Sequence, residues 1–188
     1  MGPLSDEEKA DLIVDHVIDR SSIYALEQIN IEKAVKWTFG KRLNDQRIIN
    51  EAFIKNIHQK MYGDVWKWAG RYRTSERNLG IAHYKIAQEL KVLVDDTLFW
   101  IKNDIYHAEE IAIRFKHRIV SIHCFPNGNG RHSRLMADLI IEKIYKQKYF
   151  SWGGSTLIKD DEKRRKYISA LKKADLGEYH DLILFARS

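Results

Sequence analysis

The chain has 188 residues, of which 44% are hydrophobic and 31% are charged, and its formal net charge is +6 at pH 7. This length fits one domain with a full core, and the hydrophobic content excludes a disordered chain. No apolar run is long enough to span a membrane and no secretory signal peptide is recognisable. A single cysteine excludes an intrachain disulfide, so we expect a cytoplasmic protein.

The positive charge suits a nucleic-acid partner, a polyphosphate ligand or an acidic protein surface. No zinc-ligand spacing, RNA-recognition aromatic motif or clear helix-turn-helix pattern accompanies it. Direct binding to nucleic acid or to a membrane is therefore not expected, and a solvated basic surface is the simpler interpretation.

Apolar residues at helical spacing, with capping residues and glycines at the segment ends, predict an all-α protein. A capping box at residues 5–8 opens a short first helix. Ser21 and Ser22 cap a second helix that runs to Phe39, and Asn44 caps a third that ends at Gly63. Further helices are predicted over residues 85–102, 107–122, the segment ending near 146, 160–174 and 179–186, which makes about eight in all.

Residues 72–84 interrupt this pattern because they have no helical period. They contain Asn78 and Gly80, which are turn residues. We predict a short β-hairpin or an extended loop here.

Residues 123–134, with the sequence His-Cys-Phe-Pro-Asn-Gly-Asn-Gly-Arg-His-Ser-Arg, organise the rest of the chain. The segment before them has one apolar helical face. The segment after them, residues 135–144, is apolar on nearly every side, which is typical of a helix in the middle of a domain. The polar stretch is therefore predicted to be a loop at the start of a central buried helix.

A helix start offers unpaired N–H groups and the positive end of the helix dipole. Gly128 and Gly130 let the backbone bend around an anion, and Arg131 and Arg134 can each form two hydrogen bonds to phosphate oxygens. His123, just before the loop, can accept a proton from an attacking hydroxyl. This set predicts a polyphosphate site; the alternative is a histidine in an interhelical turn beside solvated arginines.

The stretch resembles the Fic-family signature His-x-Phe-x-(Asp/Glu)-Gly-Asn-Gly-Arg-x-x-Arg, and seven of its eight fixed positions match. Over about residues 3–188 the chain is similar to the Fic subfamily called mobile mystery protein B. The resemblance implies one Fic domain over residues 1–188, a compact helical bundle around a central buried helix with a β-hairpin flap. Residues 5–40 would be N-terminal helices that include a candidate inhibitory helix.

The same resemblance implies a protein adenylyltransferase that moves AMP from ATP to a Ser, Thr or Tyr hydroxyl of a target protein, with a toxin-like role. His123 would be the general base and Phe125 the residue that anchors the loop in the core. The nucleotide phosphates would be bound by Gly128, Asn129, Gly130, Arg131 and Arg134.

In Fic proteins the flap pairs with a segment of the target through backbone hydrogen bonds. The resemblance therefore implies that Leu79, Gly80 and Ile81 dock the target; the alternative is an ordinary surface loop. Subfamily members tend to be encoded beside a helix-turn-helix protein, mobile mystery protein A, which is a candidate partner.

Many Fic proteins carry an inhibitory glutamate in the pattern (Ser/Thr)-x-x-x-Glu-(Gly/Asn), and it pairs with the second arginine of the signature. Here Ser22 and Glu27 are one residue too far apart and Gln28 replaces Gly or Asn. Glu27 is nevertheless the candidate inhibitory residue, with Arg134 as its expected partner. An exposed helix glutamate is the alternative.

Asn127 is where the chain departs from the signature, since most active members have Asp or Glu there to hold Mg²⁺. A neutral amide oxygen is a weaker ligand for a hard cation. Three outcomes follow from this substitution. Mg²⁺ or Mn²⁺ is held mainly by the phosphates of ATP with help from Asn127, another phosphate-containing donor is used, or transfer is lost and a nucleotide-binding pseudoenzyme remains.

Overall fold

The computed structural model describes residues 4–14, 19–154 and 161–188. Across these residues the chain forms nine α-helices, a 3₁₀ turn and one π-helical turn. In chain order they are α1 (Asp6–Asp11), α2 (Arg20–Phe39), α3 (Asp45–Ile48), α4 (Glu51–Tyr62), the 3₁₀ turn η1 (His83–Lys85), α5 (Ile86–Lys102), α6 (Ala108–Ile122), α7 (Asn129–Leu139), the π turn η2 (Ile140–Ile144), α8 (Asp161–Asp175) and α9 (His180–Arg187).

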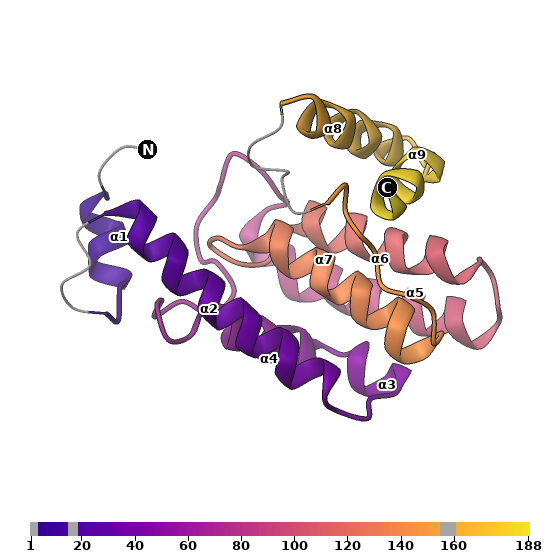
Figure 1. Ribbon diagram of the computed structural model, residues 1–188, viewed down its shortest axis with the longest axis horizontal. Coiled ribbons are helices and arrows are strands. Elements are labelled where there is room, and N and C mark those ends of the chain that lie inside the picture. Colours follow the sequence, from indigo (N-terminus) through magenta and orange to yellow (C-terminus); the bar gives the residue numbers. More distant parts are fainter. Residues whose placement is uncertain (1–3, 15–18, 155–160) are drawn as a thin grey trace.

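Helix α7 lies at the centre of the bundle and packs against α6, α4 and α2. Figure 1 shows α8 and α9 on one side of this centre and α2 with α4 on the other. Most of α7 is buried, including Leu135, Met136 and Leu139. Arg131 and Arg134 are only half-buried, so the central helix is not enclosed all round but turns one stripe of its surface toward a cleft.

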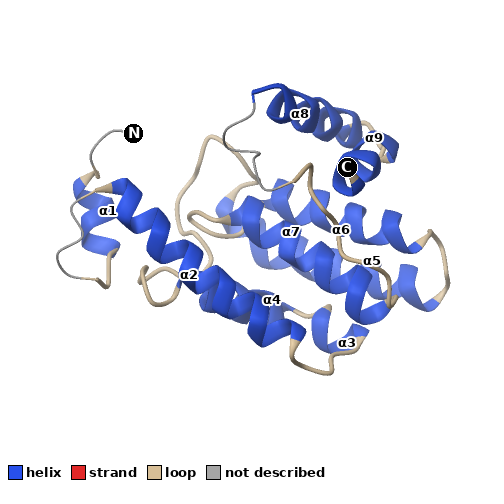
Figure 2. Ribbon diagram, viewed as in Figure 1, coloured by secondary structure: helices blue, strands red, loops and turns tan. Residues whose placement is uncertain are grey.

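The all-α prediction is confirmed, because the described residues contain helices and loops and no β-strand (Figure 2). The β-hairpin predicted for residues 72–84 is wrong, and the alternative prediction of an extended loop is the one that the structure shows. We call these residues the flap. The reason for the difference lies in the hydrogen bonds of Ile81. Its carbonyl accepts from the side chain of Arg73 and its N–H donates to the Ile122 carbonyl, so neither group is paired across a hairpin.

The predicted helix over residues 45–62 is broken into α3 and α4 at Ile49 and Asn50. Asn50 has extended backbone angles, and its side-chain oxygen accepts a hydrogen bond from the Phe53 N–H at 2.8 Å. This is the geometry of an N-cap, which Asn favours over a place inside a helix. The periodicity of the apolar residues continues through the break and therefore conceals it.

The start of one helix also differs from expectation. The N-cap of α2 is Asp19, whose carboxylate accepts from the N–H groups of Ser21 and Ser22, so the two serines lie inside the helix. The capping box of α1 forms as predicted between Ser5 and Glu8. The expected start of α8 at residue 160 lies outside the described residues. No helix in the described part of the chain is both long and apolar enough to cross a bilayer.

Candidate functional site

A cleft of about 1130 Å³ opens along the exposed stripe of α7. Its walls come from α2, the end of α6, α8 and the flap. The residues of the signature that line it are His123, Asn127, Gly128, Asn129, Gly130, Arg131 and Arg134. The sequence-predicted residues Leu79 and Gly80 of the flap reach the same cleft.

His123 ends α6 with a left-handed backbone, at φ 57° and ψ 60°. Burial lowers the pKa of its imidazole below 6.5, and the charges of Arg73 and Arg77 act in the same direction, while a hydrogen bond with the Leu79 backbone opposes them. The ring is therefore neutral at physiological pH. A neutral imidazole in a cleft can accept a proton, which is the property that a general base needs.

The shape of the loop between α6 and α7 is fixed by hydrogen bonds and packing of its own side chains. The Asn129 amide accepts from the Phe125 N–H at 3.0 Å and donates to the Phe125 carbonyl at 2.8 Å. Phe125 itself is fully buried and stacks on His58 with a centroid distance of 3.7 Å. Asn129 thus contributes backbone, rather than its amide, to the cleft.

The start of α7 is free to bind an anion. Its N-cap is Gly128, at φ 77°, and no side chain caps the first N–H groups among the described residues. A Cβ on Gly128 would lie 2.5 Å from the Tyr62 ring, so a larger residue cannot replace it. A Cβ on Gly130 would meet no atom within 4 Å, which shows that this turn faces open space. Uncapped N–H groups at a helix start form an anion site without further help.

Glu27 does pair with an arginine of the signature, but with Arg131 rather than Arg134, so the expected partner is wrong. Glu27 Oε2 lies 2.6 Å from Arg131 Nη1, and Trp66 Nε1 donates to Glu27 Oε1 at 2.7 Å. The Glu27 side chain is 6% exposed. The reason is geometric, because Arg131 is in the first turn of α7 beside Tyr62, and Arg134 is one turn further along.

The side chain of Arg134 makes no hydrogen bond or ion pair with another described residue. It lines the cleft on the side of α8. Burial lowers the pKa of Lys116 to about 7, and the charge of Arg134 acts in the same direction. Burial raises the pKa of Tyr167, and the charge of Arg134 opposes that rise. The two arginines therefore differ: Arg134 can bind a ligand directly, whereas Arg131 must first separate from Glu27.

The residues around Asn127 do not fit a metal ion on their own. The Asn127 side-chain oxygen already accepts from the Gly128 N–H at 2.7 Å, and its backbone carbonyl is 3.0 Å from His58 Nε2. No group of three or more His, Cys, Asp or Glu side chains in the described residues is placed to hold a metal. Any cation at this site would have to arrive with the ligand.

The predicted docking residues of the flap differ in exposure. Leu79 is 70% exposed, whereas Ile81 is half-buried and bonded to the Ile122 carbonyl through its N–H at 3.4 Å. Gly80, at φ 103°, lies directly against His123, because a Cβ there would be 2.6 Å from the His123 Cβ. The flap thus brings an exposed side chain and the imidazole to the same edge of the cleft.

His58 is a site residue that sequence reasoning missed. It is fully buried on α4; its Nδ1 accepts from the Gly70 N–H at 2.9 Å and its Nε2–H donates to the Asn127 carbonyl at 3.0 Å. Burial lowers its pKa well below 6.5, so the ring stays neutral with both nitrogens bonded. The only hint in the sequence was a polar residue inside the apolar pattern of residues 49–61.

We expect His58→Phe to lower the free energy of unfolding by roughly 1–3 kcal/mol, because the ring stacking survives while two buried hydrogen bonds are lost. Thermal denaturation measures this as a fall in Tm of about 2–4 °C for each kcal/mol in a chain of this size. His180→Phe is the matched control, since His180 is exposed on α9. Equal Tm values for the two variants would show that His58 does not hold the loop.

Cys124 behaves as a buried thiol rather than as a nucleophile. Its side chain is fully buried, and burial raises its pKa to about 12. The thiolate is therefore absent at neutral pH, and the side chain acts as a small apolar group.

A sequence model described as the Fic/DOC family matches residues 48–141, which is half of the chain and contains the loop, the flap and α7. The chain belongs to the Fic/DOC family. Among curated relatives, the protein adenylyltransferase Fic of Aedes aegypti is 24% identical over 163 residues, covering 85% of this chain and 31% of the relative. This Fic chain therefore spans about a third of the length of that relative.

Two solved structures show the same fold. Fic-1 from C. elegans superposes with a TM-score of 0.70 at 23% identity, covering 93% of this chain and 50% of that one. The BepC protein from Bartonella tribocorum, solved with bound AMPPNP, has a TM-score of 0.63 at 16% identity, covering 91% and 87%. At these identities the likeness establishes the Fic fold of this chain.

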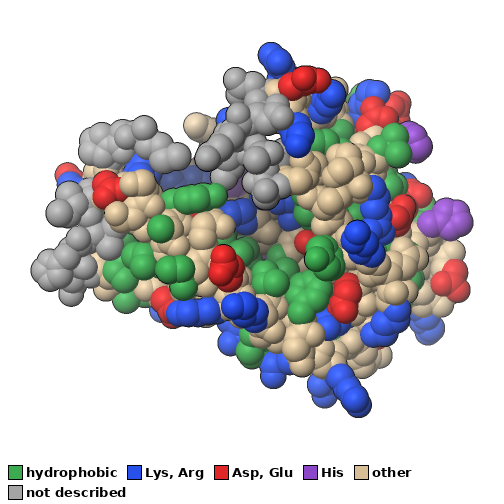
Figure 3. Space-filling view, in the orientation of Figure 1, with side chains coloured by type: hydrophobic (Ala, Val, Ile, Leu, Met, Phe, Trp, Pro, Cys, Tyr) green, Lys and Arg blue, Asp and Glu red, His purple; other side chains and the backbone are tan. Residues whose placement is uncertain are grey.

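The surface charge of this Fic chain has no single basic patch on the face drawn in Figure 3. Lys and Arg side chains are spread over that face, with Asp and Glu side chains among them. A nucleic-acid site normally gathers its cations on one face or along one helix. This face therefore gives no support to direct nucleic-acid binding.

Proposed function

We propose that the chain is a protein adenylyltransferase that moves AMP from ATP to a Ser, Thr or Tyr hydroxyl of a target protein. The observation that carries the proposal is one cleft that holds a neutral imidazole at His123, an uncapped helix start at Gly128 and an unpaired Arg134. Membership of the Fic/DOC family and curated relatives named protein adenylyltransferase support the same activity.

In the proposed reaction, the target hydroxyl gives its proton to His123 and its oxygen attacks the α-phosphorus of ATP. The new bond forms as the bond from the α-phosphorus to the bridging oxygen breaks, and pyrophosphate leaves. The N–H groups at the start of α7 and the guanidinium of Arg134 face the phosphate oxygens, where charge builds up in the transition state. Phe125 and Asn129 hold the loop in the shape that this requires.

The flap would position the target. Leu79 is exposed beside His123, and the target segment would lie along residues 79–81 with backbone hydrogen bonds. Docking at this edge places a side-chain hydroxyl of the target next to the imidazole. The flap and His123 would therefore act on the same segment of the target protein.

We further propose that Glu27 restrains the enzyme, through Arg131. The carboxylate occupies the guanidinium that would otherwise bind a phosphate, and two anions cannot share it. Trp66 holds the second carboxylate oxygen, which makes the restrained state specific in geometry. An exposed helix glutamate, the alternative interpretation, does not fit a side chain that is 6% exposed.

A second candidate function is a pseudoenzyme, or a transferase that uses another phosphate-containing donor. The observation that favours it is Asn127, whose amide is neutral and is bonded within its own loop. If the chain does transfer AMP from ATP, the cation would arrive bound to the phosphates of ATP, as part of the substrate.

Asn127→Asp separates these candidates, because an aspartate keeps the acceptor for the Gly128 N–H and adds a negative charge for the cation. If the neutral amide limits transfer from Mg²⁺–ATP, we expect the variant to raise the initial rate roughly tenfold, the effect of about 1.4 kcal/mol in the transition state. Asn103→Asp, at the exposed end of α5, is the control for added charge. A rate unchanged by Asn127→Asp would show that the amide does not limit the reaction.

The finer assignments belong to the same proposal. We place the chain in the mobile mystery protein B subfamily as a single Fic domain with a toxin-like role in the cytoplasm. The helix-turn-helix protein called mobile mystery protein A is the proposed partner, and it would carry out any contact with DNA.

The experiment that tests the proposed function compares ATP labelled at the α-phosphate with ATP labelled at the γ-phosphate. The full chain is incubated with either nucleotide, Mg²⁺ and a cell lysate, and protein-bound label is counted. Adenylyl transfer predicts label on protein from the α-position and none from the γ-position. Label from the γ-position would indicate phosphoryl transfer, and ATP binding without label from either position would indicate a pseudoenzyme.

A further inference from the structure

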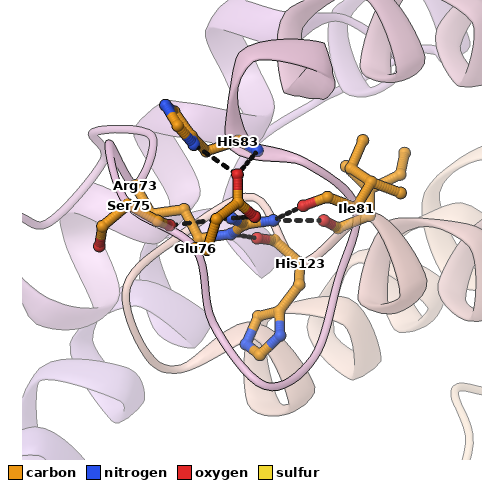
Figure 4. Close-up of polar contacts among 7 residues, drawn as sticks. Arg73, Ser75, Glu76, Ile81, His83 and His123 are labelled. Atoms are coloured by element: carbon orange, nitrogen blue, oxygen red, sulfur yellow. Dashed lines mark hydrogen bonds and ion pairs between the residues drawn. The ribbon is translucent and has the colours of Figure 1, made fainter.

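Arg73 is a buried arginine near the start of the flap. Its side chain is 1% exposed, and its carboxylate partner among the described residues, Glu76, is 3.8 Å from Nη1. Three of its donors bond backbone carbonyls instead: Nε to His123 at 2.7 Å, Nη1 to Ser75 at 3.0 Å, and Nη2 to Ile81, with Ile122 at 3.4 Å as a second acceptor. We call this set of contacts the Arg73 clamp (Figure 4).

The Arg73 clamp joins two segments that are far apart in the sequence. Ser75 and Ile81 belong to the flap, and Ile122 and His123 to the end of α6. A planar guanidinium holds five N–H donors in a fixed fork that can bond well-separated carbonyls, whereas the three donors of a lysine ammonium leave from one atom. The distance between the flap and the end of α6 is therefore set by one side chain.

The end of α6 needs such support because His123 has φ 57°. A left-handed backbone is unfavourable for a residue other than glycine, because Cβ comes too close to the following carbonyl oxygen. Arg73 bonds both peptide carbonyls that follow this turn, since its Nε donates to His123 and its own N–H donates to the Cys124 carbonyl at 3.0 Å. The strained turn is thus fixed from the side of the flap.

The flap is equally close on the other side of His123. A Cβ on Gly80 would lie 2.6 Å from the His123 Cβ and 2.9 Å from Arg73 Nη2. Figure 4 shows that the imidazole points away from the guanidinium. Arg73 therefore bonds the backbone of His123, while the His123 side chain lines the cleft.

An outer pair of side chains closes the clamp. Glu76 lies 3.8 Å from Arg73 Nη1, and its Oε1 is 2.7 Å from His83 Nδ1 and accepts from the His83 N–H at 3.2 Å. Glu76 is more than half exposed, so this pair adds little energy by itself. It does tie the far end of the flap to the same guanidinium.

We propose that Arg73 is the positioning residue for His123. It fixes the distance between His123, the base, and residues 79–81 of the flap, where the target would dock. This inference rests on the proposed function, because the separation matters only if a hydroxyl docked on the flap gives its proton to His123. Arg73 does not line the cleft that holds the phosphates. Its loss should therefore affect the chemical step and leave nucleotide binding intact.

The test uses Arg73→Lys in the full chain, together with Glu27→Gly to release Arg131. We expect kcat for α-label transfer to fall roughly 10- to 100-fold, the cost of a base misplaced by about 1 Å, with KM for ATP essentially unchanged. The matched control is Arg114→Lys, because Arg114 packs between Tyr106 and Tyr179 on α6, away from the cleft. The control should change neither constant.

A second readout does not depend on activity. Arg73→Lys should speed hydrogen exchange of the Ile81 amide, which is bonded to the Ile122 carbonyl, and Arg73→Gln should raise the pKa of the His123 imidazole in an NMR titration because a nearby positive charge is removed. Neither measurement requires transfer activity, so both test the role of Arg73 even if the proposed function fails. Absence of transfer in the Glu27→Gly parent would contradict the proposed function alone.

The positioning role is supported by a selective loss of kcat or, if the parent is inactive, by faster Ile81 exchange together with a changed His123 titration. It is overturned if Arg73→Lys keeps kcat within the range of the Arg114→Lys control, or if KM for ATP rises by the same factor as kcat falls. In an inactive parent, unchanged exchange at Ile81 would overturn it.

Discussion

Glycine in place of Glu27 is expected to raise the rate of α-label transfer from ATP by roughly 10- to 100-fold, which corresponds to the loss of a hydrogen-bonded charged contact of about 1.5–3 kcal/mol. In the wild-type chain a phosphate can bind Arg131 only after the Glu27 carboxylate has left it. The variant removes that competition, so a phosphate gains the guanidinium at no such cost. Initial rates with the lysate, at ATP concentrations below KM, measure the effect.

Glycine also weakens a helix, so a control must separate that effect from the release of Arg131. Glu32→Gly places the same substitution in α2 at an exposed position away from the cleft. It should lower Tm like Glu27→Gly but leave the transfer rate unchanged. Equal rates in both variants would mean that the Glu27–Arg131 pair does not restrain the enzyme.

Glu27→Gln refines the same prediction. The amide oxygen can still accept from Trp66 Nε1, but the negative charge on Arg131 is gone. We expect a release intermediate between the wild type and Glu27→Gly, because a neutral hydrogen bond to the guanidinium is weaker than a charged one. If Glu27→Gln is as slow as the wild type, the negative charge of Glu27 does not restrain transfer, and the position of α2 over the cleft does.

The central features of the fold and cleft were readable from sequence because they depend on local patterns. A polar loop between an amphipathic segment and an apolar one must lie at the start of a buried helix, and the structure places Gly128 at that start. The glycine pattern predicts one shared role for Gly128 and Gly130, bending the loop around an anion. The structure separates the two, because a Cβ on Gly128 would collide with Tyr62 and a Cβ on Gly130 would meet no atom within 4 Å. Helix ends marked by Asn or Ser were mostly placed within a few residues.

The missed features depend on contacts between distant segments. Spacing within α2 made Glu27 a candidate, but which arginine it reaches is decided by where α2 crosses α7, and no local pattern encodes that crossing. His58 and Arg73 were missed for the same reason. Each is a polar side chain that bonds a backbone carbonyl 50 or more residues away, Asn127 for His58 and His123 for Arg73, and a backbone partner leaves no trace in the residue types.

These long-range contacts share a physical logic. The loop and the end of α6 contain carbonyls that no helix can satisfy, and buried carbonyls must find donors elsewhere. His58 supplies one donor from α4 and Arg73 supplies several from the flap. The cleft is therefore rigid on the side of the base and the loop, whereas the pair between Glu27 and Arg131 is a single side-chain contact that ligand binding can displace.

His123→Asn should have the largest effect, a fall in the transfer rate of roughly 10²- to 10⁴-fold, which is the usual contribution of a general base. Asparagine is the informative replacement because it tolerates the left-handed backbone found at φ 57°, whereas alanine would add strain at the end of α6. The rate is measured with α-labelled ATP in the Glu27→Gly background. An unchanged Tm and unchanged ATP binding would show that only the chemical step is lost.

The pH dependence gives an independent check on the same residue. Burial, followed by the charges of Arg73 and Arg77, lowers the pKa of His123 below 6.5, and the Leu79 backbone opposes them only in part. A base with a lowered pKa remains deprotonated at mildly acidic pH, so the rate should stay level from neutral pH to below 6.5 and fall as the pH drops through the lowered pKa. A rate that already declines above pH 6.5 would mean that a group other than His123 is titrating. The residual rate of His123→Asn is the control, because it should not fall at acidic pH if His123 is the group that titrates.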